Sequence, residues 1–297
     1  MNRRTTVITL IIVVVAAGGY YLTRWQQVRK TNELMQALVA PDDREASQAM
    51  AQLQAHGVRL YPRLVALTQS PLPRARWRSA VLLGELSNPT AGEALVGLLA
   101  DPDVTTRAAA AQALGRLGVK AAVEPLAQLV ARVSEPLPVR VSAARALGLL
   151  GSAHAVPQLV QALGYQLVVA EGAADDSWQL RSAAAGALGA VADSEAIRAL
   201  AGRAAAQVER DGQVRAVVAY ALADALAGGG LSEQDAVTAV EALVQAAKDD
   251  NGDVRAAAVI ALVSVEIPPA QESQVEPVLE QARQDPDYWV RAAAGGS

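Results

Sequence analysis

Residues 103–118 read DVTTRAAAAQALGRLG, a stretch of small apolar residues that contains Arg107. The positions three, four, seven and ten residues after Arg107 hold alanine or leucine, which places them on one face of an α-helix. Alanines on this face let a neighbouring helix approach closely. Gly115 is expected to leave room at a tight helix crossing, and Gly118 is expected to end the helix.

The same stretch recurs along the chain. In six copies that are 31 to 41 residues apart, a leucine stands seven residues after an arginine. These copies begin at Arg76, Arg107, Arg140, Arg181, Arg215 and Arg255. A truncated last copy surrounds Arg291, and a degenerate earlier copy starts at residue 42. The period indicates a repeat architecture.

Each copy contains a second apolar segment. In four copies a leucine follows nineteen residues after the arginine, and this predicts a second amphipathic helix. These leucines are Leu95, Leu126, Leu159 and Leu200. A helix pair of this size cannot bury its apolar face alone, but stacked pairs can, so the pattern predicts a solenoid.

The pattern D-x-x-V-R-x-x-A-A-x-A-L-G-x-L-G resembles the bacterial HEAT-like repeats of the type also found in phycobilisome lyases. The resemblance covers about residues 41–294. It implies an all-α, right-handed α-solenoid of about seven helix pairs, the last one incomplete. It says little about function, because unrelated binding proteins share this fold.

The N-terminus predicts a membrane anchor. Residues 5–23 carry no charge, and as a helix they would be about 28 Å long, close to the thickness of a bilayer core. Basic and aromatic residues follow, as in an interfacial collar, namely Tyr20, Tyr21, Arg24 and Trp25. We therefore predict one transmembrane helix, with residues 1–30 as anchor and 31–297 as repeat domain. The alternative is a signal peptide cleaved after residues 15–17.

Charge is distributed unevenly. Residues 1–80 hold 11 basic and 4 acidic residues, whereas the remainder of the chain is acidic. A short basic N-terminus before an apolar run favours a bacterial inner-membrane protein whose repeat domain is periplasmic. A cytoplasmic repeat domain, or secretion after cleavage, is the alternative.

Residue types that support catalysis are scarce. The chain has no cysteine and two histidines, His56 and His154, so a metal or cofactor site is not expected. A basic cluster, Arg59, Arg63, Arg74, Arg76 and Arg78, lies after the collar, but no basic stripe continues along the acidic repeats. Nucleic-acid binding is therefore not expected either.

The repeated arginines are interpreted as a structural ladder. Asp103, Asp211 and Asp287 precede three of them by four residues, where they can cap the helix and pair with an arginine. The ladder consists of Arg76, Arg107, Arg140, Arg181, Arg215, Arg255 and Arg291.

Partner binding is expected where the repeat is interrupted. Residues 164–180 lengthen one unit and contain Tyr165, Val168, Val169 and Trp178. The alternative is an elongated helix that packs its own apolar residues. A second candidate surface is the incomplete last repeat, with Tyr288 and Trp289.

The chain is therefore predicted to be a non-catalytic, membrane-anchored scaffold without a cofactor. Its second helices would bind another protein or a membrane protein complex. The alternative is a lyase-like or chaperone-like protein that handles a cofactor or an assembly client.

Overall fold

The computed structural model describes residues 3–55, 60–166 and 176–296, and of residues 3–16 and Pro89 it describes only the backbone. Every regular element in the described part of the chain is a helix, as the sequence predicted. The chain divides into two compact units, Met1–Leu86 and Ser87–Ser297, here called the N-terminal unit and the C-terminal unit.

The described residues of the N-terminal unit form four α-helices. They are α1 (Arg3–Leu38), α2 (Asp43–Gln54), α3 (Tyr61–Leu67) and α4 (Pro73–Glu85). Helix α2 packs against both α1 and α4, and α3 packs against α4. Helix α1 runs without a break through residues 30 and 31, so the predicted boundary between anchor and repeat domain falls within a helix.

The segment predicted to span a membrane, residues 5–23, lies in α1. The side chains of residues 5–16 are outside the described part of the chain. Among the residues that the structure describes, no helix is both long enough and apolar enough to cross a bilayer. The anchor stays a prediction.

The C-terminal unit is built from alternating first and second helices. The first helices, which carry the repeated arginines, are α6 (Val104–Arg116), α8 (Leu137–Leu150), α10 (Trp178–Val191), α12 (Gly212–Ala227), α14 (Gly252–Ser264) and α16 (Tyr288–Ala293). The second helices are α5 (Gly92–Leu98), α7 (Val123–Ala131), α9 (Val156–Leu163), α11 (Ser194–Arg203), α13 (Glu233–Ala246) and α15 (Glu272–Ala282). Short 3-10 turns precede four of the second helices, at Pro89–Ala91, Lys120–Ala122, Ala153–Ala155 and Pro269–Gln271.

Helix α6 forms from the stretch around Arg107 in the way its sequence predicts. Asp103 caps the helix, since its carboxylate accepts a hydrogen bond from the amide of Thr106 at 2.8 Å. Ala111 and Leu114 are completely buried. Gly118 ends the helix with φ +66°, a left-handed conformation that glycine adopts without strain.

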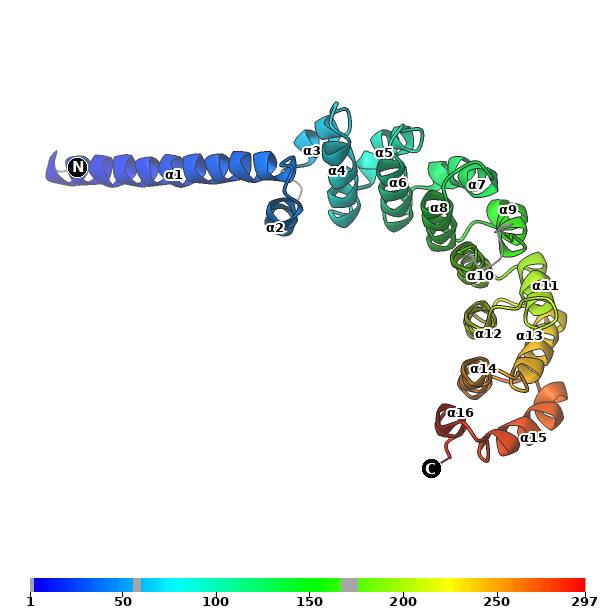
Figure 1. Ribbon diagram of the computed structural model, residues 1–297. Coiled ribbons are helices and arrows are strands. Elements are labelled where there is room, and N and C mark those ends of the chain that lie inside the picture. The colour runs from blue at the N-terminus through cyan, green and yellow to red at the C-terminus, as the bar shows by residue number, and fades with distance from the viewer. Residues whose placement is uncertain (1–2, 56–59, 167–175, 297) are drawn as a thin grey trace. The chain divides into compact units, whose positions relative to one another are not determined.

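The helices of the C-terminal unit form two rows (Figure 1). Each first helix contacts the next first helix, from α6 through α16, and each second helix contacts the next one, from α7 through α15. Within this unit the first helices lie on the inner side of a curve and the second helices on the outer side (Figure 1). Because neighbouring helix pairs stack, their apolar faces are buried against each other. The leucines predicted for the second helices, Leu95, Leu126, Leu159 and Leu200, are completely buried.

The inner row is close-packed because of three glycines. A β-carbon on Gly115 would lie 2.7 Å from Cα of Ala146, and one on Gly189 would lie 2.8 Å from Cα of Ala221. Gly148 makes an equivalent approach to Ala187, at 2.9 Å. These distances are shorter than carbon–carbon van der Waals contact, so only glycine fits at these three crossings. The tight crossing predicted for Gly115 is confirmed.

The described ends of the long segment between α9 and α10 are not helical. Helix α9 ends at Leu163, and Gly164, Tyr165 and Gln166 follow outside any helix. The elongated-helix alternative was therefore wrong for these residues. Gly164 caps α9 through its amide, which donates to the carbonyl of Val160.

Candidate functional site

The repeated arginines bind the loop that precedes their own helix. In five copies a guanidinium Nη1 donates to the carbonyl six residues earlier, at 2.6 to 2.9 Å. The donors are Arg76, Arg107, Arg215, Arg255 and Arg291, and the acceptors are Ser70, Asp101, Glu209, Asp249 and Asp285. This bond fixes the turn that leads into each first helix.

Four arginines of the ladder also bind a carboxylate of the following helix pair. Arg215 donates from Nε and Nη2 to both carboxylate oxygens of Asp249, at 2.8 and 2.7 Å. Arg255 binds Asp285 in the same bidentate way, at 2.9 and 2.8 Å. Arg181 pairs with Glu209, and Arg107 pairs with Glu135, at 2.8 and 2.7 Å. Each ion pair therefore joins two neighbouring helix pairs of the C-terminal unit.

Two of the carboxylates that pair with arginines also accept hydrogen bonds from backbone amides. The Asp249 carboxylate accepts from the amide of Asn251, and that of Asp285 accepts from the amide of Asp287, both at 2.8 Å. The hydrogen bond from Arg255 lowers the pKa of Asp285 below its ordinary value, although burial opposes this shift. The hydrogen bond with Asp249 raises the pKa of Arg215 above its ordinary value. Four of the seven arginines of the ladder are therefore held in charged pairs.

The partner that the sequence suggested for these arginines was wrong. Asp103, Asp211 and Asp287 were expected both to cap their helices and to pair with an arginine. They do cap the helices, through hydrogen bonds from backbone amides of the first turn. The paired acids instead lie earlier in each loop, because the capping carboxylates point at the helix N-terminus.

Arg140 departs from this pattern. Its Nε donates to the carbonyl of Val130 at 2.9 Å, and its guanidinium lies over the ring of Tyr165, 4.2 Å from the centroid. The carbonyl of Tyr165 accepts a hydrogen bond from Arg181 at 3.3 Å. Tyr165, a predicted partner-binding residue, therefore links two arginines of the ladder across the long segment.

The other predicted binding residues that the structure describes lie on two helices, α10 and α16. Val168 and Val169 lie outside the described residues, and Trp178 is half-buried at the start of α10. Tyr288 and Trp289 are exposed at the start of α16, where their rings meet edge to face with centroids 5.3 Å apart. His154 is exposed, and His56 lies outside the described residues.

A surface that the sequence did not predict lies on the inner row. Its exposed apolar side chains are Leu149 on α8 (65% exposed), Tyr220 on α12 (44%) and Ile260 on α14 (40%). They stand five or nine residues after the repeated arginine of their helix, opposite the face that packs against the second helices. Gly186 on α10 faces open space at the equivalent position. We call these four positions the inner face.

The predicted interfacial collar is solvent-exposed. Tyr20, Tyr21 and Trp25 all expose more than half of their side chains along α1. The guanidinium of Arg29 lies 5.7 Å from the ring centroid of Trp25. The aromatic residues therefore stand on the helix without a packing partner that buries them.

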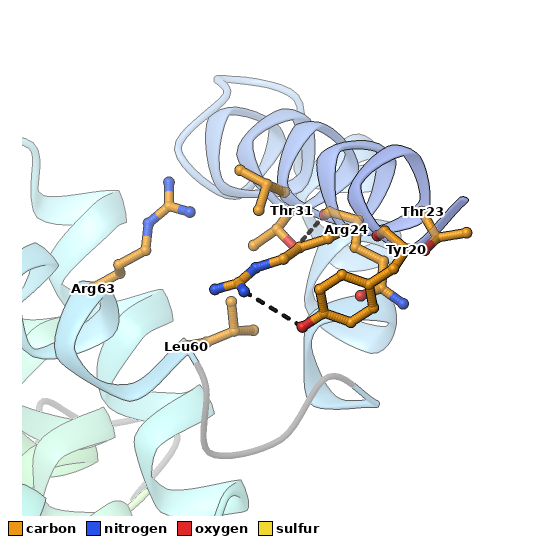
Figure 2. A pocket seen from close by; sticks show the side chains of 8 residues that line it. Tyr20, Thr23, Arg24, Thr31, Leu60 and Arg63 are labelled. Carbon is orange, nitrogen blue, oxygen red and sulfur yellow. Dashed lines mark hydrogen bonds between the residues drawn. The ribbon is translucent and has the colours of Figure 1, made fainter. Parts of the chain in front are cut away.

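A groove of about 840 Å³ lies between this part of α1 and the start of α3. Tyr20, Arg24 and Thr31 line it from α1, and Leu60 and Arg63 line it from the other side (Figure 2). Both guanidinium groups extend into the space between the two segments (Figure 2). Arg24 Nη1 lies 3.5 Å from the hydroxyl of Tyr20.

The basic cluster noted in the sequence is mostly used inside the N-terminal unit. Arg74 donates to the carbonyl of Val39 at 2.7 Å, and the buried Arg78 donates to that of Leu38 at 2.8 Å. These contacts satisfy carbonyls at the end of α1 that have no intrahelical partner. In the part of the chain that the structure describes, no group of three or more histidine, aspartate and glutamate side chains is arranged to hold a metal ion.

A family model for HEAT repeats matches residues 93–169 and 209–297, which is more than half of the chain. The chain belongs to the HEAT-repeat family. No curated protein matches this HEAT-repeat chain.

Solved structures with the same repeat fold include an engineered protein and the complex of CpcE and CpcF of phycocyanin lyase from Nostoc sp. PCC7120. The engineered protein is 21% identical with a TM-score of 0.50, and the match covers 89% of this chain and 76% of that one. The lyase complex has the same identity and TM-score, over 78% of this chain and 91% of the other. Human deoxyhypusine hydroxylase is also 21% identical, over 92% and 96% of the two chains, with a TM-score of 0.37. At this identity the likeness to the engineered protein and to the lyase complex shows the fold alone.

Proposed function

We propose that this HEAT-repeat protein is a non-catalytic scaffold that binds another protein through the inner face. The observation that carries the proposal is the exposure of Leu149, Tyr220 and Ile260 on the same side of the first helices. Exposed apolar side chains that gather on one side of a repeat protein are typical of protein-binding sites. This proposal replaces the second helices, which the sequence favoured, with the first helices.

The chemistry of the inner face suggests what it binds. Arg145 is exposed on α8 at the position equivalent to Tyr220, and Asp224 is exposed one turn after Tyr220 on α12. A partner segment with apolar side chains flanked by charges of both signs would complement this surface. Gly186 leaves space on α10 into which a partner side chain can insert.

The experiment is a quantitative pull-down from detergent-solubilised membranes with the purified full chain. Tyr220→Asp combined with Ile260→Asp should abolish the capture of a protein that the native chain retains. Val208→Asp is the matched control, because Val208 is an exposed apolar residue outside the first helices. Equal capture by all three proteins would refute the inner face as the binding surface.

The second part of the proposal is a membrane tether formed by residues 5–23. It is supported by the uncharged sequence of that segment and by the exposed collar of Tyr20, Tyr21 and Trp25. The repeat domain would then lie in the periplasm of a bacterial cell. Tethering would raise the local concentration of the scaffold near membrane partners.

Fractionation tests the tether. The chain should remain in the membrane pellet after extraction with alkaline carbonate, and protease added to spheroplasts should digest residues 41–297. Recovery in the soluble fraction would refute the tether, and protection in spheroplasts would refute the periplasmic orientation. An absorbance spectrum of the purified chain tests the lyase-like alternative, which requires that a pigment or other cofactor binds.

A further inference from the structure

We propose that the groove between α1 and the start of α3 binds a phosphate group, and that Arg24 and Arg63 are its ligands. The inference deepens the membrane tether proposed above and rests on it, since a phosphate at this position would come from an anionic lipid headgroup. Three features of the groove support it, namely its unbalanced charge, the way its arginines are held and its position on α1.

The groove carries positive charge without a counter-charge. None of the described residues that line it is acidic. In the described part of the chain, no salt bridge involves Arg24 or Arg63, whereas four arginines of the ladder pair with carboxylates. Two cations that face one cavity repel each other, and an anion between them removes this repulsion.

The arginines are held in positions suitable for anion binding. Arg63 donates from Nη1 to the side-chain carbonyl of Asn32 on α1 at 2.9 Å, which directs its guanidinium across the groove. Arg24 lies against the hydroxyl of Tyr20. A guanidinium has five N–H donors, so each arginine keeps donors for a ligand after these contacts. Two arginines on opposite walls can bind different oxygens of one phosphate.

The position of the groove indicates the source of the phosphate. Arg24 and Tyr20 lie at the end of the uncharged segment, on the same turns of α1 as the exposed Tyr21 and Trp25. Aromatic side chains of this kind lie at the level of lipid headgroups in membrane proteins. A helix that places Trp25 at this level also places Arg24 beside the phosphates of the same leaflet.

Native mass spectrometry of the full chain in a neutral detergent tests the proposal. The chain is titrated with dioleoylphosphatidylglycerol or with dioleoylphosphatidylcholine, and inorganic phosphate is added in a separate series. We expect one molecule of the anionic lipid to bind about tenfold more tightly than the zwitterionic lipid, as charge-assisted hydrogen bonds predict.

The decisive variant is Arg24→Gln combined with Arg63→Gln, which should remove this preference. Arg29→Gln combined with Lys30→Gln is the matched control. It also removes two positive charges, but from positions on α1 that do not line the groove. The control should keep most of the preference. Equal losses in both double variants, or equal binding of the two lipids by the native chain, would overturn the phosphate site.

The remaining outcomes separate the source of the phosphate from the tether. Inorganic phosphate that displaces the lipid at equal concentration would support the phosphate site but overturn the headgroup as its source. A chain that stays in the carbonate-washed membrane but shows no anionic-lipid preference would retain the tether and lose the groove. Circular dichroism of both double variants verifies that they fold.

Discussion

Gly115 of α6 and Ala146 of α8 are so close that a β-carbon on Gly115 would lie 2.7 Å from the Cα of Ala146. The neighbouring backbone cannot move away cheaply, because α8 is packed against both α7 and α10. Gly115→Ala should therefore destabilise the C-terminal unit by about 1–3 kcal/mol, as overpacking generally does. Urea unfolding of the purified chain measures the change.

Gly186 provides the matched control, since a β-carbon at this position would meet open space, with no atom of a neighbouring helix within 4 Å. Gly186→Ala should stabilise the protein by up to about 1 kcal/mol through helix propensity. If both variants changed the free energy of unfolding in the same direction, the close approach of α6 and α8 would be refuted.

The charged ladder should respond strongly to the loss of one partner. Arg215 and Asp249 are both buried, so Arg215→Ala leaves a carboxylate without its cation in the interior. The expected cost is about 3–5 kcal/mol. Glu280, which pairs with Arg283 at an exposed site, is the comparison, and Glu280→Gln should cost less than about 1 kcal/mol. Similar melting temperatures for the two variants would contradict the structural role of the ladder.

Asp285 makes part of the stability dependent on pH. Its folded pKa is lowered, chiefly by the hydrogen bond from Arg255, so its contribution is present above the ordinary value of about 3.9. That contribution is lost as the pH falls through the lower folded pKa. Asp285→Asn should be less stable than the native chain at pH 7, and the difference should shrink below about pH 4. Thermal unfolding at several pH values tests this, and a constant difference would contradict it.

Ala192 occupies a position that favours glycine. It ends α10 with φ +54°, whereas Gly118 and Gly151 occupy the corresponding left-handed ends of α6 and α8. Ala192→Gly should stabilise the protein by about 1 kcal/mol, because the left-handed conformation costs alanine about that much.

The control for this substitution lies two residues earlier. Ala190 is exposed within the same helix, so Ala190→Gly should instead destabilise by about 0.5–1 kcal/mol. Differential scanning calorimetry compares the two variants. Destabilisation by Ala192→Gly would show that this helix end does not have the left-handed conformation.

The helix pattern could be predicted from the sequence because it depends on local rules. The spacing after Arg107 located α6, and the glycines at 115 and 118 predicted a crossing and a helix end. The ion-pair partners were missed, because Glu135 and Glu209 lie 28 residues from their arginines and contact them only after the units stack. The capping aspartates were closer in sequence, but helix capping takes up their carboxylates.

The exposed surface was harder to predict for a related reason. Leu149, Tyr220 and Ile260 are apolar residues within apolar helices, and the sequence alone did not separate them from the core. Their positions, five or nine residues after the arginine, identify them as exposed only when it is known which face of each first helix packs against the second helices. The groove beside Arg24 likewise joins α1 to Arg63, which is distant in sequence.

The glycine crossings also determine how the C-terminal unit can deform. At Gly115, Gly148 and Gly189 the inner helices are already in backbone contact, so the inner row resists compression. A force that tightens the curve therefore meets a stiff response, whereas a force that opens the curve does not press these backbones together. The equivalent positions of α12 and α14 carry Ala223 and Val263 in place of glycine, and Val263 is exposed, so we expect this end of the unit to be the more compliant one. We therefore expect the C-terminal unit to deform more easily when a partner spreads the inner face than when a partner compresses it.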